Sequence, residues 1–123
     1  MKRAFTTLTD ATLITAVVQH GYGEIITDAL LDVGIQGSTI HSAMGVGIRE
    51  RLGALGVAVD AERDVVNVVV SSDEVDRIFE RIFLAGKLDT PGQGIMYMSK
   101  LDRLATFVPE SLMPLRSADA RRN

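Results

Sequence analysis

Residues 64–71 read DVVNVVVS, and residues 72–83 continue as SDEVDRIFERIF. The first stretch is short, apolar and rich in valine, which is typical of a buried strand. Ser72 is the expected N-cap of a helix that follows. In that helix, apolar side chains recur on one face, at Val75, Ile78, Phe79, Ile82 and Phe83. A strand followed directly by an amphipathic helix is therefore the unit that decides the fold.

The same unit occurs earlier in the chain. Residues 13–19 (LITAVVQ) predict a strand, and residues 24–33 predict a helix whose C-cap glycine is Gly34. The segments 14–34 and 66–86 have equal length, and each ends in glycine. This correspondence indicates a faint internal repeat.

Each unit is followed by a further expected strand. The first is residues 36–44 (QGSTIHSAM), and the second is residues 95–99 (IMYMS). The order strand–helix–strand, loop, strand–helix–strand predicts an α+β, ferredoxin-like βαββαβ fold, in which two helices cover one face of a four-stranded antiparallel sheet. We expect one domain over residues 11–108, with a mobile loop at 44–62, an N-terminal extension at 1–10 and a C-terminal tail at 109–123.

The valine-rich strand is apolar on both sides. Because side chains alternate along a strand, Val65 and Val69 point one way and Val66, Val68 and Val70 point the other. A strand that is apolar on both sides is buried on both sides. Since the two helices cover only one face, we expect another copy of the chain to cover the other.

Composition excludes several classes of protein. The 123 residues carry 13 basic and 16 acidic side chains, so the net charge of −3 argues against a nucleic-acid-binding protein. There is no cysteine, and no apolar run reaches the roughly 20 residues of a membrane span. The expectation is a cytoplasmic protein that is not itself embedded in a membrane.

No catalytic or metal-binding constellation is evident, so we do not expect an enzyme or a metal site. His20 and His41 lie on different predicted strands and have no metal-binding spacing. The acidic residues Asp60, Glu62 and Asp64 are expected to form a solvated turn.

Two glycine clusters are candidate binding loops. Gly45-Val46-Gly47 follows the second predicted strand, and Gly92-Gln93-Gly94 precedes the fourth. Glycines allow successive backbone N–H groups to point into one concavity that can bind phosphate. On composition alone, each cluster is more typical of an ordinary tight turn than of a binding loop.

Taken together, these elements resemble the PII signal-transduction family, almost without gaps from Leu13 to Phe107. The motifs that carry the resemblance are LITAVVQ, DALLDVGIQG, the second strand with its Gly45-Val46-Gly47 exit, DVVNVVVSSDEVDRIFERI and TPGQGIMYM. The early HGYGEII and the later GVAVDAERDVV suggest a divergent PII-like branch.

The resemblance implies a homotrimer with a nucleotide in each cleft between subunits. Gly37 and Thr39 match positions that meet an adenine, and Asn67 and Val69 match positions that contact the base or ribose. Arg63 matches a cation near the effector. The positions matching the loops beside the phosphates are Gly45, Gly47, Gly92, Gln93 and Gly94.

Several positions depart from the family pattern. Ile95 replaces a phosphate-binding lysine, and Thr106 and Val108 replace two arginines. Arg49 replaces the glutamine that helps to hold Mg²⁺ and 2-oxoglutarate, and no tyrosine lies between Gly45 and Ala61 for uridylylation. Losing charge-assisted bonds of about 1.5–3 kcal/mol each disfavours ATP with 2-oxoglutarate.

The departures leave two explanations. Either the ligand has fewer phosphates, as in ADP or AMP with or without a small anion, or other cations replace the missing ones, namely Arg49, Arg51, Lys87, Lys100 or Arg103. No further cofactor is required. The resemblance implies that the loop controls a partner, which in this family is often a membrane transporter. The alternative function is an assembly or interaction module with a degenerate ligand site. A metal-responsive protein and a slow nucleotide hydrolase have little support.

Overall fold

The computed structural model describes residues 7–44 and 62–106. Four strands form the main sheet, and two helices connect them: β2 (Ala11–Gln19), α1 (Tyr22–Asp32), β3 (Thr39–Met44), β4 (Glu62–Ser71), α3 (Val75–Ala85) and β5 (Gly94–Lys100). The expected loop, apart from its end residues, lies outside the described residues. The same is true of Gly45, Gly47, Arg49 and the tail from residue 109.

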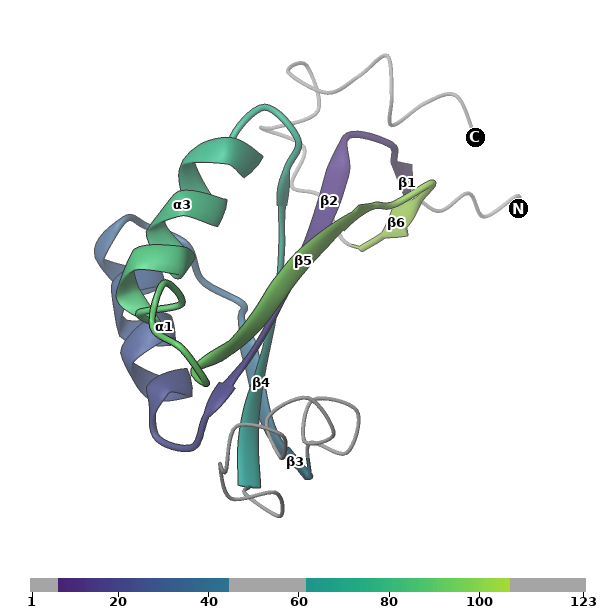
Figure 1. Cartoon of the computed structure of the whole chain (residues 1–123). Helices are drawn as coiled ribbons and strands as arrows, with labels where there is room; N and C mark the ends of the chain where they lie inside the picture. Colours follow the sequence, from purple (N-terminus) through teal and green to yellow (C-terminus); the bar gives the residue numbers. More distant parts are fainter. Residues whose placement is uncertain (1–6, 45–61, 107–123) are drawn as a thin grey trace, which may run out of the picture.

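The sheet has the strand order β3-β4-β2-β5, and every neighbouring pair is antiparallel. The two central strands pair over their length, from Ala11 opposite Ser71 to Gln19 opposite Arg63. Both helices lie on the same side of this sheet (Figure 1). These observations confirm the predicted α+β, ferredoxin-like arrangement, in which the two strand–helix units place their strands side by side at the centre.

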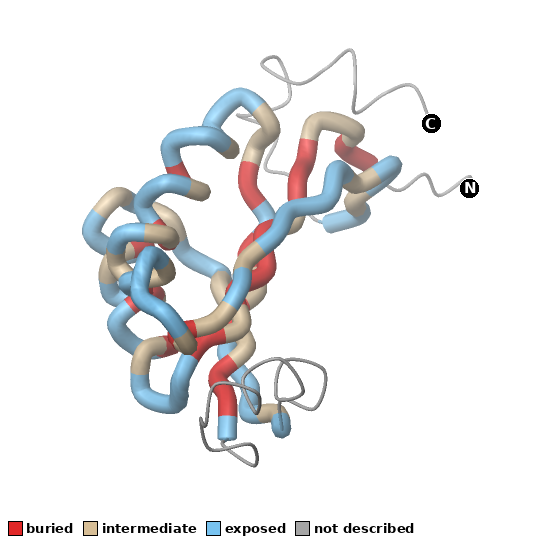
Figure 2. The backbone as a smooth tube through the Cα atoms, in the orientation of Figure 1, coloured by how far each residue is buried: buried red, intermediate tan, exposed pale blue. Residues whose placement is uncertain are grey.

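The core lies between the helices and one face of the sheet, where the buried backbone follows the central strands (Figure 2). The side chains on this face of β2 and β4 alternate with those on the other face, as a strand requires. Residues from all four elements are almost fully buried there: Ile14, Val18, Ile26, Leu30, Val66, Val68, Ile78 and Ile82.

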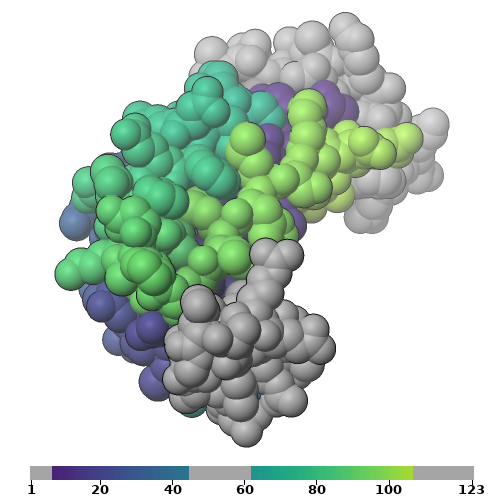
Figure 3. All heavy atoms as spheres, in the orientation of Figure 1, coloured from purple at the N-terminus to yellow at the C-terminus, as the bar shows by residue number. Residues whose placement is uncertain are grey.

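Neither of the two helices covers the opposite face of the sheet (Figure 1). Val65 is half-buried there, and Val69 is 38% exposed. Ile95 and Tyr97 of β5 are 48% and 51% exposed, and the atoms of β5 lie at the surface in the space-filling view (Figure 3). The apolar second face expected from the valine pattern is therefore present, and it is partly exposed at these residues. We call it the open face.

The first helix ends as the sequence predicts. Gly34 has φ +83°, its N–H donates to the carbonyl of Leu31, and the N–H of Ile35 donates to that of Leu30. This pair of bonds is the Schellman arrangement, which needs a left-handed residue. Gly86, the repeat partner of Gly34, has φ −84° instead. A Cβ on Gly86 would lie 3.1 Å from Ile26, so this glycine allows the two helices to approach.

Ser72 is not the N-cap of the second helix. The cap position is Glu74, and residues 72–74 form a turn. The hydroxyl of Ser72 is 2.7 Å from that of Thr12 on β2 and is therefore engaged across the sheet. Beyond the main sheet, β1 (Thr7–Leu8) pairs with β6 (Leu104–Ala105), two short strands that the sequence pattern did not reveal.

Candidate functional site

Arg63 is the most unusual side chain of the open face. It lies on β4 opposite Gln19 of β2 and Ala43 of β3, and only 3% of the residue is exposed. Its Nε and Nη1 atoms are buried, and no hydrogen-bond partner is found for them among the described residues. Burying guanidinium N–H groups without hydrogen-bond partners is costly, so this arrangement favours an anionic partner at this end of the sheet.

A row of polar side chains crosses the open face further along β4. Thr39 is directly opposite Asn67, which in turn is opposite Thr15. The hydroxyl of Thr15 donates to Oδ1 of Asn67 at 2.7 Å, which leaves the Asn67 amide NH₂ as a donor for another group. The row lies about 13 Å from Arg63, since four residues of strand separate them. Val69 extends the same face two residues beyond the row.

The loop at residues 92–94 lies at the Arg63 end of the sheet. Gln19, the β2 neighbour of Arg63, donates from its backbone N to the carbonyl of Gln93 at 3.1 Å. Its side-chain Nε2 donates to the carbonyl of Gly92 at 3.3 Å. Gln19 therefore links the loop to the strand that borders Arg63, a role that sequence reasoning did not assign to it.

Each of the three loop residues suits its position for a different structural reason. Gly92 has φ +80°, with open space where a Cβ would be. Gly94 has φ +148°, and a Cβ there would be only 1.9 Å from the carbonyl oxygen of Val17. Gln93 is buried, and its side-chain Nε2 donates to the carbonyl of Gly86. The Gln93 side chain thus stabilises the loop from inside, whereas the glycines determine its path.

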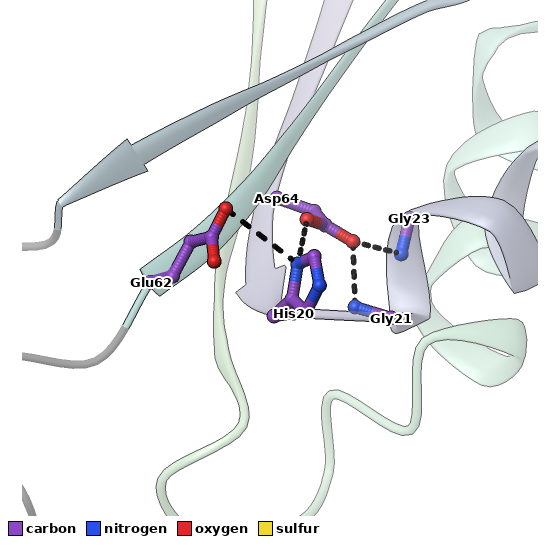
Figure 4. Close-up of polar contacts among 5 residues, drawn as sticks. All are labelled: His20, Gly21, Gly23, Glu62 and Asp64. Atoms are coloured by element: carbon purple, nitrogen blue, oxygen red, sulfur yellow. Dashed lines mark hydrogen bonds and ion pairs between the residues drawn. The ribbon is translucent and has the colours of Figure 1, made fainter.

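A second polar cluster joins the start of β4 to the start of α1 (Figure 4). Oδ2 of Asp64 accepts hydrogen bonds from the backbone N–H groups of Gly21 at 2.8 Å and Gly23 at 3.0 Å. Oδ1 of Asp64 lies 3.0 Å from Nδ1 of His20, and Glu62 is 3.9 Å from the same nitrogen. The expected solvated turn is therefore wrong for Asp64, which is 5% exposed because it caps a helix.

This cluster shifts the protonation equilibria of two side chains. Burial alone would raise the pKa of Asp64, but the bonds from Gly21, Gly23 and His20 outweigh burial and hold its pKa below the usual value. The hydrogen bond to Asp64, followed by the negative charges of Glu62 and Asp64, raises the pKa of His20. The described residues contain no group of three His, Asp or Glu side chains arranged to hold a metal ion.

The fold and these contacts can be compared with known proteins. The family model for the nitrogen regulatory protein P-II matches residues 11–109, which is most of the chain. The chain belongs to the nitrogen regulatory protein P-II family. The sequence resemblance is thereby confirmed. As a member of this family, the chain is a ligand-binding regulatory protein.

Among solved structures, 179 chains match this P-II protein. One of them is the crystal structure of Arabidopsis thaliana PII bound to citrate, at 19% sequence identity and a TM-score of 0.62. The match covers 76% of this chain and 79% of the Arabidopsis chain, and it supports the fold. No curated protein sequence matches. None of the helices in residues 7–44 and 62–106 is long and apolar enough to cross a membrane.

The predicted site residues of this P-II chain fall into two groups. Thr39, Arg63, Asn67 and Val69 lie on the open face of β3 and β4, and Gly92 to Gly94 lie at the edge next to β2. Gly37, at φ +87°, precedes β3. Within one chain, Gln19 connects the two groups at the Arg63 end of the sheet. Sequence reasoning missed Gln19, Thr15 and the His20–Asp64 pair. Gln19, His20 and Asp64 lie at or near strand ends, whereas Thr15 lies in the middle of β2 and carries no such signal.

Proposed function

We propose that this P-II chain assembles as a homotrimer, binds an adenine nucleotide in the clefts between subunits and controls a partner protein through the segment at residues 44–62. ADP or AMP, with or without a small anion, is preferred over ATP with 2-oxoglutarate. The partner is a membrane transporter, engaged on its cytoplasmic side. Family membership carries the regulatory part of this proposal.

Arg63 is the single observation that supports an anionic ligand. Its buried Nε and Nη1 atoms have no partner among the described residues, and a phosphate or carboxylate oxygen would satisfy both. The neighbouring row of Thr39 and Asn67 offers hydroxyl and amide groups, which are suited to a base or sugar. The open face places the charged and the neutral groups on the same side of the sheet.

The preference for fewer phosphates rests on the residues near the loop. Ile95 follows Gly94 and is 48% exposed, where the family pattern has a phosphate-binding lysine. Thr106 is exposed and neutral, where the pattern has an arginine. A site with fewer cations offers less compensation for each added phosphate charge.

The subunit contact is assigned to the open face. Val69, Ile95 and Tyr97 expose between 38% and 51% of their surface there, and Val65 is half-buried. Covering such a face with another copy removes apolar surface from water, at about 25 cal/mol per Å². A neighbouring chain would also bring a second set of loop residues close to Arg63.

Calorimetry on the full chain tests the ligand. ADP, AMP and ATP, the last with and without 2-oxoglutarate, are titrated into the parent protein and into Arg63→Met. Arg63→Met should weaken binding by about 10- to 100-fold, because it removes charge-assisted hydrogen bonds. Arg77→Met, on an exposed part of α3, is the matched control and should bind as the parent does. Absence of binding by every nucleotide at millimolar concentration would reject this function.

The second candidate is an assembly or interaction module with a degenerate site, and the neutral Ile95 and Thr106 favour it. Thermal unfolding separates the two functions. A nucleotide-binding protein is stabilised progressively as ligand concentration rises, whereas a degenerate site produces no ligand-dependent shift.

A further inference from the structure

The turn that joins β2 to α1 is held by a cluster of three ionisable side chains. Nδ1 of His20 lies 3.0 Å from Oδ1 of Asp64 and 3.9 Å from Oε2 of Glu62. The other oxygen of Asp64 accepts the backbone N–H groups of Gly21 and Gly23. The Asp64 carboxylate therefore joins the start of strand β4 to His20 and to the first turn of α1 (Figure 4).

The same turn borders the proposed ligand site. Gln19 immediately precedes His20 and binds the loop at Gly92 and Gln93 through two hydrogen bonds. Arg63 lies between Glu62 and Asp64 on β4 and is opposite Gln19. Because strand side chains alternate, Arg63 points to the open face while its two acidic neighbours point to the face that carries α1. A movement of this end of β4 therefore changes both faces together.

We propose that the β2–α1 turn is a proton-responsive joint. Protonated His20 holds Asp64 and Glu62 together against the turn. Loss of the proton releases Glu62 and shifts Gln19 and the Gly92–Gly94 loop. Neutral His20 can still donate one hydrogen bond from Nδ1 to Asp64. It has no charge with which to attract Glu62, so the two protonation states favour different arrangements of the strand end.

The charges around His20 favour its protonated form. The groups that act on it are Asp64 and Glu62 from β4 and Glu24 from α1, and all three are acidic. The loop at 92–94 contributes no ionisable side chain. The His20 side chain is 64% exposed, so its proton exchanges freely with solvent. The pKa of His20 is raised above 6.5, the ordinary value for a histidine, so its protonation changes above that pH.

The sign of the effect follows from the direction of this shift. A histidine whose pKa is higher in the folded state stabilises that state fully below about 6.5, and the contribution is lost as pH rises through the folded pKa. The joint is therefore closed below about pH 6.5 and loosens as pH rises through the folded-state pKa of His20.

Side-chain and amide NMR of the full, ligand-free chain across this pH range tests the joint. The ring signals of His20 should titrate with a raised pKa, and the amide signals of Gly21, Gly23 and Gly92 to Gly94 should follow the same curve. Asp64→Asn and Glu62→Gln should each lower the pKa of His20. His20→Gln, which keeps a hydrogen-bond donor but does not titrate, should abolish the linked changes, and His41→Gln should leave them intact.

Two results would overturn the joint. The first is a His20 pKa that is the same in Glu62→Gln and in the parent; Glu62 is half-exposed, so this variant remains informative even if Asp64→Asn does not fold. The second is a titration of His20 that leaves the amides of the 92–94 loop unmoved. The link to ligand binding rests on the proposed function, but these measurements use no ligand. A protein that binds no nucleotide and still shows the linked titration would reject the proposed function alone.

Discussion

Asp64 of β4 and Gly23 of α1 are in direct contact across the fold. The N–H of Gly23 donates to Oδ2 of Asp64 at 3.0 Å, and a Cβ on Gly23 would lie 2.9 Å from the Cβ of Asp64. The helix has no side-chain cap from its own N-terminal residue, Gly21. A carboxylate from a distant strand therefore takes the position that a local Ser, Thr or Asp usually occupies, where the helix dipole also favours negative charge.

Replacing Gly23 with alanine should destabilise the protein. The added methyl group would meet the Cβ and Oδ2 of Asp64 at 2.9 Å, and Asp64 is buried and held by three hydrogen bonds. We expect a loss of about 1–3 kcal/mol in the free energy of unfolding, measured by urea denaturation. Asp28→Ala, at an exposed position of the same helix, is the control and should change stability by less than about 0.5 kcal/mol. Equal effects of the two variants would contradict the contact.

Asp64→Asn should change how stability depends on pH. The pKa of Asp64 is held below 3.8, the ordinary value for an aspartate, so its ionised form stabilises the fold above that value, and the contribution is lost as pH falls through the folded pKa. Near neutral pH the variant should be less stable by about 1–2 kcal/mol, and the difference should shrink in acid. Urea denaturation at several pH values measures the stability difference between the variant and the parent. A difference that stays constant into acid would contradict the prediction.

The two loop glycines should respond differently to alanine. Gly94→Ala would place a methyl group 1.9 Å from the Val17 carbonyl oxygen and should cost about 3 kcal/mol or more. Gly92→Ala meets no atom within 4 Å, but its φ of +80° should cost about 1–2 kcal/mol. Thermal unfolding of the two variants side by side measures the difference. If Gly92→Ala were the less stable of the two variants, close packing against Val17 would not be the reason for glycine at position 94.

Arg63→Met should stabilise the ligand-free protein while weakening ligand binding. The substitution removes a buried charge whose Nε and Nη1 have no partner among the described residues, and methionine fills similar space. We expect the free energy of unfolding without ligand to rise by about 1–3 kcal/mol. Urea denaturation of both proteins in phosphate-free buffer measures this. A less stable variant would mean that Arg63 is already satisfied in the free protein.

Val69→Asp should disrupt the proposed homotrimer. It introduces a charge on the open face opposite Leu13 of β2, and burying an unpaired charge at an interface is unfavourable. Light scattering should show the mass falling from three chains to one. Leu84→Asp is the matched control, because Leu84 is 62% exposed on α3, away from the open face. The interface is misassigned if Leu84→Asp dissociates the assembly and Val69→Asp does not.

The predictions from sequence succeeded where local periodicity and burial agree. The valines of residues 64–71 indicated a strand that is apolar on both sides, and the structure places Val66, Val68 and Val70 in the core and leaves Val69 exposed on the open face. The helical stripe of α3 and the left-handed Gly34 were also evident from spacing alone. Prediction failed at Ser72, because its hydroxyl binds Thr12, a residue 60 positions away in the chain.

The sequence by itself determined the two strand–helix units, their order and the apolar second face, because alternation and helical spacing are properties of neighbouring residues. Only the tertiary structure decided that Asp64 caps α1, that Gln19 connects the 92–94 loop to the strand beside Arg63, and that Nε and Nη1 of Arg63 are buried without a described partner. These contacts join residues more than 40 positions apart, and they depend on strand pairing, which brings distant side chains within hydrogen-bonding distance. In this family member, the valine-rich strand was visible in the sequence, whereas the polar site beside it emerged only when the strands paired.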